Sequence, residues 1–146
     1  MTEGHISYQP TDGLCYDPSE GLYWDADALQ KEITRTFEVC HGCRMCFKYC
    51  DSFPTLFDLI DTEHDGDVRK LSDAETAQVM DHCFQCKLCE VQCPYTVRDS
   101  HEFQLDFPKL VHRYDAQRHR RDGSTLQGAL LGDPDLTGKL ARASFG

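Results

Sequence analysis

A spacing of four cysteines occurs twice in this chain and constrains its fold more than any other feature. The first block is Cys40-x-x-Cys43-x-x-Cys46-x-x-x-Cys50, and the second is Cys83-x-x-Cys86-x-x-Cys89-x-x-x-Cys93-Pro94. Each cysteine of the second block lies 43 positions after its counterpart in the first. Eight of the nine cysteines therefore belong to an internal repeat of two copies.

This spacing is typical of iron–sulfur ligation. Three cysteines at every third position allow a curled loop to present three sulfurs to one cubane. The fourth lies about one helical turn further along, faces elsewhere and ligates the other cluster. We therefore predict two [4Fe–4S] clusters, one held by Cys40, Cys43, Cys46 and Cys93, and the other by Cys83, Cys86, Cys89 and Cys50.

Other uses of cysteine fit the spacing less well. Structural zinc sites also use Cys-x-x-Cys pairs, but a loop of a dozen or more residues usually separates the two pairs. A zinc-stabilised interaction adaptor is the first alternative. A disulfide-reducing enzyme is the second, and it needs an open iron or an exchangeable thiol, for which only Cys15 is left over. We interpret Cys15 as a small buried residue or an idle thiol.

The charge of the chain is unevenly distributed and limits its partners. The formal net charge is −10; residues 1–100 hold 19 acidic and 8 basic side chains, and residues 101–146 hold 6 and 7. An acidic domain disfavours nucleic acid and favours protein partners with basic docking faces. Neither a secretory signal nor a membrane span is evident. We expect a cytoplasmic protein, or one held at a membrane surface through a partner.

Helix signals flank both cysteine blocks. Asp25 is a candidate cap for a helix whose apolar positions Leu29, Ile33 and Phe37 lead to Cys40. Ser72 and Glu75 form a capping-box signature before a helix that leads to Cys83. A further helix with Pro108 in its first turn ends in a basic run of Arg113, Arg118, Arg120 and Arg121.

Three regions follow from these signals. Residues 1–24 form an irregular arm whose aromatic residues predict that it packs on the rest of the chain. Residues 25–121 form the mainly α-helical domain with both clusters. Residues 122–146 form an irregular, linker-like tail, which we expect to lead to further domains of a longer protein.

The two predicted clusters differ in their surroundings. Cys93 is followed by Pro94, whereas Cys50 is followed by Asp51, whose negative charge lowers the potential of the cluster that Cys50 serves. His41 and His82 adjoin ligand cysteines; because eight cysteines already match the ligand spacing, we interpret these histidines as sources of a nearby N–H dipole at most, with ligation by an imidazole as the alternative. No self-contained catalytic site is visible, so we predict an electron-transfer subunit or domain of an oxidoreductase.

The two blocks, the helical connection between them and the Cys93-Pro94-Tyr95 run resemble a known family over residues 25–115. They are similar to the α-helical ferredoxin module in the small iron–sulfur subunit of heterodisulfide reductase. They also resemble the N-terminal part of the iron–sulfur subunit of anaerobic glycerol-3-phosphate dehydrogenase. The resemblance implies a relay that receives electrons from a flavoprotein and passes them to a cysteine-rich or iron–sulfur acceptor.

Overall fold

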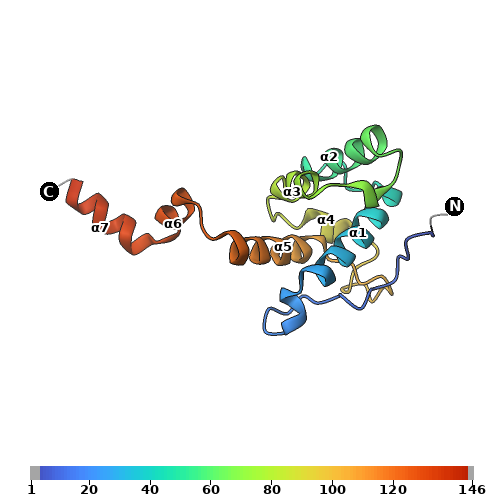
Figure 1. Cartoon of the computed structure of the whole chain (residues 1–146), viewed down its shortest axis with the longest axis horizontal. Helices are drawn as coiled ribbons and strands as arrows, with labels where there is room; N and C mark the ends of the chain where they lie inside the picture. The colour runs from blue at the N-terminus through green and yellow to red at the C-terminus, as the bar shows by residue number, and fades with distance from the viewer. Residues whose placement is uncertain (1–3, 145–146) are drawn as a thin grey trace. The chain divides into compact units, whose positions relative to one another are not determined.

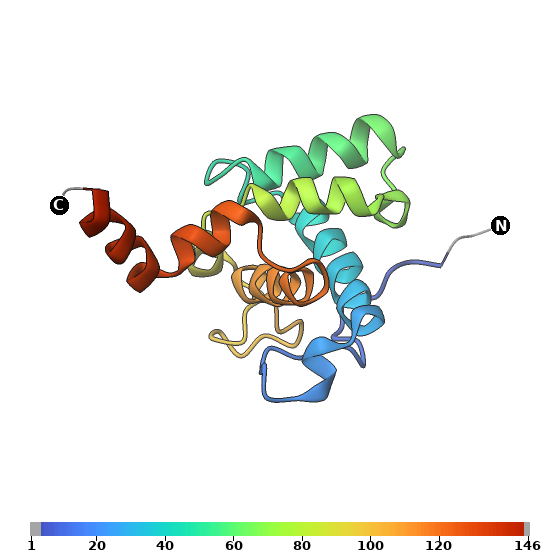
Figure 2. The ribbon, with the colours of Figure 1, turned by 60° about the vertical axis from the view of Figure 1, so that its left-hand side comes forward.

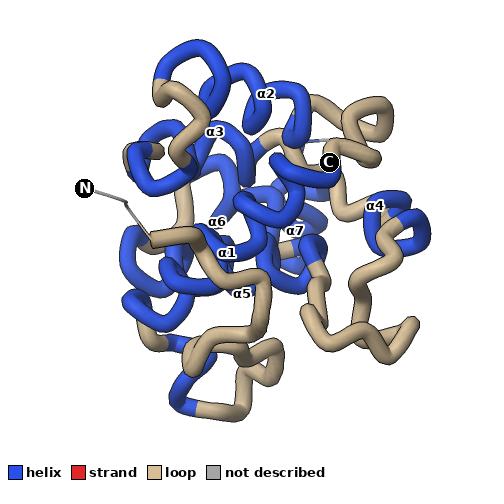
Figure 3. The backbone as a smooth tube through the Cα atoms, turned by 90° about the vertical axis from the view of Figure 1, so that its right-hand side faces the viewer, coloured by secondary structure: helices blue, strands red, loops and turns tan. Residues whose placement is uncertain are grey.

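The computed structural model describes residues 4–144, and the regular elements in this range are helices joined by loops (Figures 1 and 3). Its α-helices are α1 (Ala26–Cys43), α2 (Ser52–Asp58), α3 (Asp73–Asp81), α4 (Leu88–Gln92), α5 (Phe107–Asp122), α6 (Leu126–Gly132) and α7 (Pro134–Ser144). Short 3₁₀ turns lie at Gly21–Trp24 and Val68–Lys70, and a π-helical turn at Leu59–Glu63 continues α2. Among the described residues, β-pairing is limited to one isolated bridge between Thr96 and Leu105. The prediction of a mainly α fold is confirmed.

The helices begin where the local sequence signals place them. The Asp25 carboxylate accepts a hydrogen bond from the Ala28 N–H at 2.7 Å and caps α1. Ser72 and Glu75 form a reciprocal capping box at the start of α3, in which each side chain accepts from the other residue's backbone N–H. Pro108 is the second residue of α5, where its missing N–H leaves no helical hydrogen bond unmade. All three predicted helix starts are confirmed.

One apolar core joins α1, α2, α3 and α5. The predicted apolar face of α1, Leu29, Ile33 and Phe37, is buried in it. The other helices and connections add Phe53, Leu56, Phe57, Ile60, Val68, Val79, Met80, Phe107, Leu110 and Val111. In Figure 2, α2 in green and α3 in yellow-green run side by side, as their packing contacts require. This core supports the C-terminal end of α1 and the start of α2. The first cysteine block runs from the last turn of α1 to the residues just before α2.

The N-terminal arm packs on the domain, as predicted. Tyr23 and Cys15 are buried, and the Cys15 thiol donates to the Asp17 carbonyl at 3.5 Å. Arg113 of α5 holds the arm through three carbonyls: Gly13 at 2.7 Å, Leu22 at 2.6 Å and Tyr23 at 2.9 Å. Our assignment of Arg113 to the basic end of this helix is therefore wrong, because the residue is 1% exposed and anchors the arm.

From Asp115 onward, the described residues form a second compact unit that contains the end of α5 with α6 and α7. The prediction of an irregular C-terminal extension is wrong in its local structure. The Thr125 hydroxyl accepts from the Gly128 N–H at 3.0 Å, and the Asp133 carboxylate accepts from the Leu136 N–H at 2.9 Å. These caps begin both short helices in spite of the glycines. The leucines of the two helices remain partly or largely exposed.

Among the described helices, none is both long enough and apolar enough to cross a membrane.

Candidate iron–sulfur centre

Cysteines from both blocks line one cavity. Cys40 and Cys43 lie on the last turn of α1, Cys46 lies in the turn that follows, and Cys93 ends α4. These four thiols line one small cavity that opens to solvent. They are the four cysteines that sequence reasoning assigns to one cluster.

The remaining walls of this cavity are uncharged. They are formed by Val39, Met45, Phe53, Phe57, Pro94, Tyr95 and Leu105. Four thiols in an apolar setting are the donor set that iron–sulfur clusters use. The residues present therefore fit such a cluster.

The other four cysteines gather around Cys89 on α4. The Cys89 thiol is buried, and it lies close enough to Cys46 of the first set, and to Cys83, Cys50 and Cys86, for their charges to raise its pKa further. It also borders a second small cavity together with Cys40, Cys46 and Cys93. The two sets of thiols are therefore neighbours.

An unpaired hydroxyl supports the same chemistry. Thr36 of α1 is 1% exposed and lines the second cavity beside Cys40 and Cys46. Among the described residues, its Oγ1 atom has no hydrogen-bond partner. A buried hydroxyl without a partner costs free energy, and a thiolate or an inorganic sulfide in this cavity would accept a hydrogen bond from it.

Burial raises the pKa values of the central thiols. It is the largest cause for Cys40, whose pKa lies well above its ordinary value, and for Cys46 and Cys89, whose pKa values are raised to about 11 and about 12. Repulsion between neighbouring thiolates adds to each shift. These cysteines keep their protons at neutral pH in the metal-free chain, so iron binding must release protons.

Three residues beside the cysteines have a left-handed backbone conformation. Arg44 ends α1 at φ 57°, and Gln85 and Lys87 adopt φ 56° and 63° between the cysteines of the second block. None of the three is glycine, and the left-handed conformation costs a non-glycine residue about 1–2 kcal/mol. Such strain is typical of sites whose geometry is set by a ligand.

The two blocks differ in local structure more than their spacing predicts. α1 extends through Cys43, whereas Cys83 and Cys86 lie in irregular backbone and Cys89 lies on a separate short helix. Cys50 lies just before α2 and not in its first turn. The buried apolar residues of α1 continue to Val39, next to Cys40. By contrast, α3 ends at Asp81, two residues before Cys83.

The two histidines beside ligand cysteines have other partners. His41 Nε2 lies 2.7 Å from an Asp61 carboxylate oxygen, which also accepts from Arg44. His82 Nδ1 lies 3.1 Å from the Thr55 hydroxyl. One ring nitrogen of each imidazole is therefore occupied by a neighbouring side chain.

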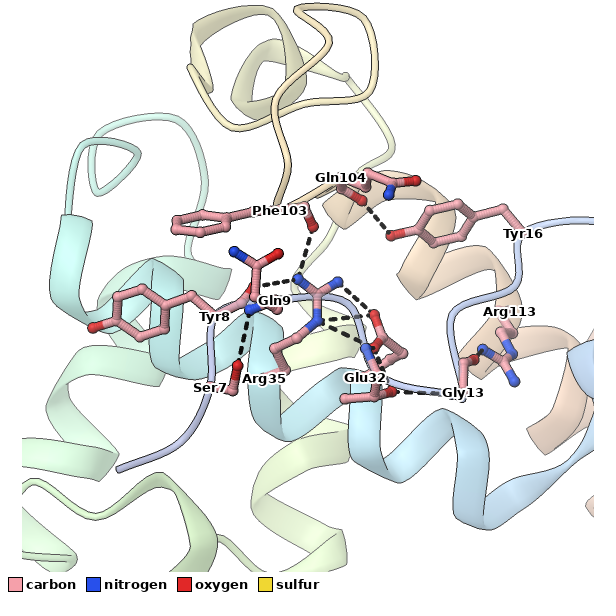
Figure 4. Close-up of polar contacts among 11 residues, drawn as sticks. Ser7, Tyr8, Gln9, Gly13, Tyr16, Glu32, Arg35, Phe103, Gln104 and Arg113 are labelled. Atoms are coloured by element: carbon pink, nitrogen blue, oxygen red, sulfur yellow. Dashed lines mark hydrogen bonds and ion pairs between the residues drawn. The ribbon is translucent and has the colours of Figure 1, made fainter. Parts of the chain in front are cut away.

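Sequence reasoning missed a buried polar group next to the site (Figure 4). Glu32 and Arg35 of α1 form an ion pair in which each side chain is 1% exposed. Glu32 also accepts from the Thr11 N–H at 2.9 Å and from the Thr11 hydroxyl at 2.6 Å. Arg35 Nη1 donates to the carbonyls of Tyr8 and Phe103 at 2.9 and 2.8 Å. The i, i+3 spacing of opposite charges was the available signal, and their place on the buried side of α1 was not recognised.

Among the described residues, no group of three or more His, Cys, Asp or Glu side chains is arranged to hold a single metal ion.

Comparison with known proteins identifies the cysteine region. Residues 39–98 match the family model of the 4Fe-4S dicluster domain. This segment contains both cysteine blocks, so the iron–sulfur interpretation of the repeat is supported. The match implies electron transfer by iron–sulfur centres.

A curated relative extends the similarity beyond this segment. The chain is 25% identical over 114 residues to Citrate utilization protein B of Escherichia coli. The alignment covers 77% of this chain but 27% of the relative, so the chain spans about a quarter of that protein's length. No solved structure matches the chain.

Proposed function

We propose that this chain is an electron-transfer domain that binds two [4Fe–4S] clusters with crossed ligation. Cys40, Cys43, Cys46 and Cys93 would hold one cluster, and Cys83, Cys86, Cys89 and Cys50 would hold the other. The observation that carries the proposal is the cavity in which Cys93 of the second block joins three cysteines of the first.

A thiolate-held cluster, when bound, takes up and releases an electron at a potential set by charge, hydrogen bonds and solvent exposure. The chain supplies an apolar setting and a hydrogen-bond donor. Phe53, Phe57 and Leu105 give the first cavity apolar walls, and the Thr36 hydroxyl is available as a donor in the second. The core under α1 and α2 holds the first block in place and limits rearrangement on electron transfer.

We further propose that the domain works as a relay in a larger oxidoreductase of the heterodisulfide reductase kind. Its partners would be a flavoprotein donor and a cysteine-rich or iron–sulfur acceptor. The support is the resemblance of the cysteine blocks and the similarity to a longer curated protein. The formal charge of −10 favours partners with basic docking surfaces.

The test is the metal and sulfide content of the anaerobically purified chain. We expect about eight iron and eight sulfide per chain, with a paramagnetic signal on reduction. The Cys15→Ser variant is the matched control and should keep the full content, because Cys15 lies outside both blocks. Stoichiometric zinc without sulfide would overturn the proposal in favour of an interaction adaptor.

A further inference from the structure

The exposed apolar side chains of the first compact unit gather at the two cysteine blocks. Among residues 4–114, seven large apolar side chains are at least 36% exposed, and Leu22 on the N-terminal arm is the one that lies away from the blocks. The other six lie in the blocks or shortly after the second one. We call these six the cysteine-loop patch: Met45, Phe47, Phe84, Leu88, Val91 and Val97.

The members of the patch are well exposed for side chains of their kind. Phe84 is 74% exposed and Val91 is 64% exposed. The half-exposed Phe47 ring has the Lys48 ammonium above it, 5.3 Å from the ring centroid. Single apolar side chains on a surface are ordinary, but a concentration of them marks an interaction site. Aromatic side chains and methionine are also enriched at protein interfaces.

The patch lies against the cysteines that we assign to both clusters. Five of its six members are one or two residues from a ligand cysteine in the chain. Met45 of the first block lines the first cavity together with Cys93 of the second. The Tyr49 hydroxyl donates to the Gln92 side chain at 3.1 Å and links the blocks again. A protein that covers the patch therefore lies next to the proposed ligands of both clusters.

Nearly all acidic side chains of the first 100 residues lie outside the cysteine blocks. Of these 19 acidic residues, only Glu90 lies within residues 40–50 or 83–93. The blocks also contain three basic residues, which offset part of the negative charge that thiolate-held clusters bring: Arg44, Lys48 and Lys87. An apolar area on an acidic domain is complementary to an apolar docking face that basic residues surround.

The same charges disfavour a second copy of this chain as the occupant of the patch. Two copies would each bring a net charge of −10 to the interface, and like charges repel. A partner with basic residues around its docking face meets no such repulsion.

On the basis of the proposed function, we propose that the cysteine-loop patch is the docking face for a redox partner protein whose own apolar docking face is surrounded by lysine and arginine. Docking there covers the exposed apolar side chains and brings the partner's redox centre next to the cluster ligands. One electron then passes from a reduced cluster to the partner, so that the cluster is oxidised and the partner is reduced.

The test uses cytochrome c as the probe, because it is a basic redox protein whose haem edge is surrounded by lysines. The cluster-loaded full chain is reduced anaerobically and mixed with ferric cytochrome c, and the haem absorbance gives the second-order rate constant. Phe84→Ser/Val91→Ser removes the two most exposed members of the patch and should lower this rate constant about tenfold. Met45→Ser/Phe47→Ser should lower it similarly. An unchanged rate constant in either loaded variant would overturn the proposal.

Leu22→Ser is the matched control for these substitutions. Leu22 is exposed just before α1 begins, whereas the first cysteine block starts at the other end of this helix. The substitution should leave the rate constant unchanged, and an equal loss would overturn the proposal. Hexaammineruthenium(III), a small redox cation that needs no docking face, should accept electrons equally fast from every variant. A parallel loss with this cation would show damaged clusters and would also overturn the proposal.

Two measurements on the unmodified chain decide the matter if the variants fail to load. Hydrogen–deuterium exchange with cytochrome c present should show protection at residues 45–47 and 84–91, and protection confined to other segments would overturn the proposal. Sedimentation of the loaded chain should show a monomer. A dimer in which these same residues are protected would overturn the proposal in favour of a second copy.

Iron and sulfide analysis separates these results from the proposed function. A chain that holds both clusters and reduces the small cation, but whose reaction with cytochrome c is insensitive to the patch, defeats only the docking face. A chain without clusters defeats the proposed function itself.

Discussion

Arg35 donates from Nη1 to the carbonyl of Phe103, 68 residues further along the chain, at 2.8 Å. The same guanidinium binds Glu32 of its own helix and the Tyr8 carbonyl of the arm. One buried side chain thus connects the arm, α1 and the loop after the second cysteine block. Since Glu32 is fully buried and the two carbonyl contacts are partly buried, the loss of the guanidinium leaves the carboxylate without its partner in the interior.

Arg35→Met should therefore lower the free energy of unfolding by about 3–5 kcal/mol, because it leaves the Glu32 carboxylate buried without its cation. The double variant Glu32→Leu/Arg35→Met should lose less than the single one, because no unpaired charge remains. The measurement is denaturant unfolding of the cluster-loaded chain, followed by far-UV circular dichroism. A double variant less stable than Arg35→Met would contradict this account.

Lys31 provides the matched control on the same helix. It pairs with Asp12 at 2.9 Å, but the two side chains are 53% and 79% exposed. Such exposed pairs contribute about 0–1 kcal/mol. Lys31→Met should accordingly leave the unfolding transition almost unchanged.

The capping box of α3 predicts a specific loss of stability in acid. The pKa of Glu75 is lowered from its ordinary value of 4.5, chiefly by the hydrogen bond from the Ser72 N–H, then by the Ser72 hydroxyl and His64. A carboxyl with a lowered folded-state pKa stabilises the fold fully above its ordinary pKa, and this stabilisation is lost as the pH falls through the lower value.

Glu75→Gln should therefore be less stable than the unmodified chain at pH 7, and the difference should shrink toward about pH 3. Asp73→Asn is the control, because it removes an acid from the same first turn but leaves the capping box intact. Thermal unfolding across this pH range measures both differences. A gap between Glu75→Gln and the unmodified chain that stays constant with pH would refute the assignment.

How far the sequence predicts the structure depends on the distance between interacting residues. Asp25, Ser72 and Pro108 act on backbone groups within a few residues, so their helix starts could be predicted from local patterns. The apolar face of α1 could be predicted for the same reason. Thr125 and Asp133 cap two helices that we did not predict, because the neighbouring glycines are typical of a linker.

Arg113 shows where local patterns fail. It stands in a basic run, yet its partners are carbonyls of the arm 90 to 100 residues earlier in the chain. Backbone carbonyls carry no sequence signal, so nothing near Arg113 could reveal them.

The charge beside Cys50 predicts a shift in the other cluster. Asp51 is exposed just before α2, next to a cysteine that we assign to the cluster held by Cys83, Cys86 and Cys89. Removing one nearby charge changes the energy of an added electron by about 1 kcal/mol, or roughly 40 mV. Asp51→Asn should therefore raise the lower of the two potentials in a redox titration.

Asp58 is the control for this substitution. It is an exposed acid at the end of α2, seven residues and roughly 10 Å of helical rise beyond Asp51. Asp58→Asn should have a much smaller effect on either potential. Equal shifts from the two substitutions would show that net charge, and not the position of Asp51, controls the potential.

Crossed ligation is the central claim, and two double variants test it most directly. If Cys40 and Cys93 serve one cluster, Cys40→Ala/Cys93→Ala damages that cluster alone. The anaerobically loaded chain should then retain one intact cluster, with its four iron and its paramagnetic signal on reduction. Cys40→Ala/Cys50→Ala should damage both clusters and leave neither signal intact. The reverse pattern, with one intact cluster only in Cys40→Ala/Cys50→Ala, would show that each block holds its own cluster and would contradict the account.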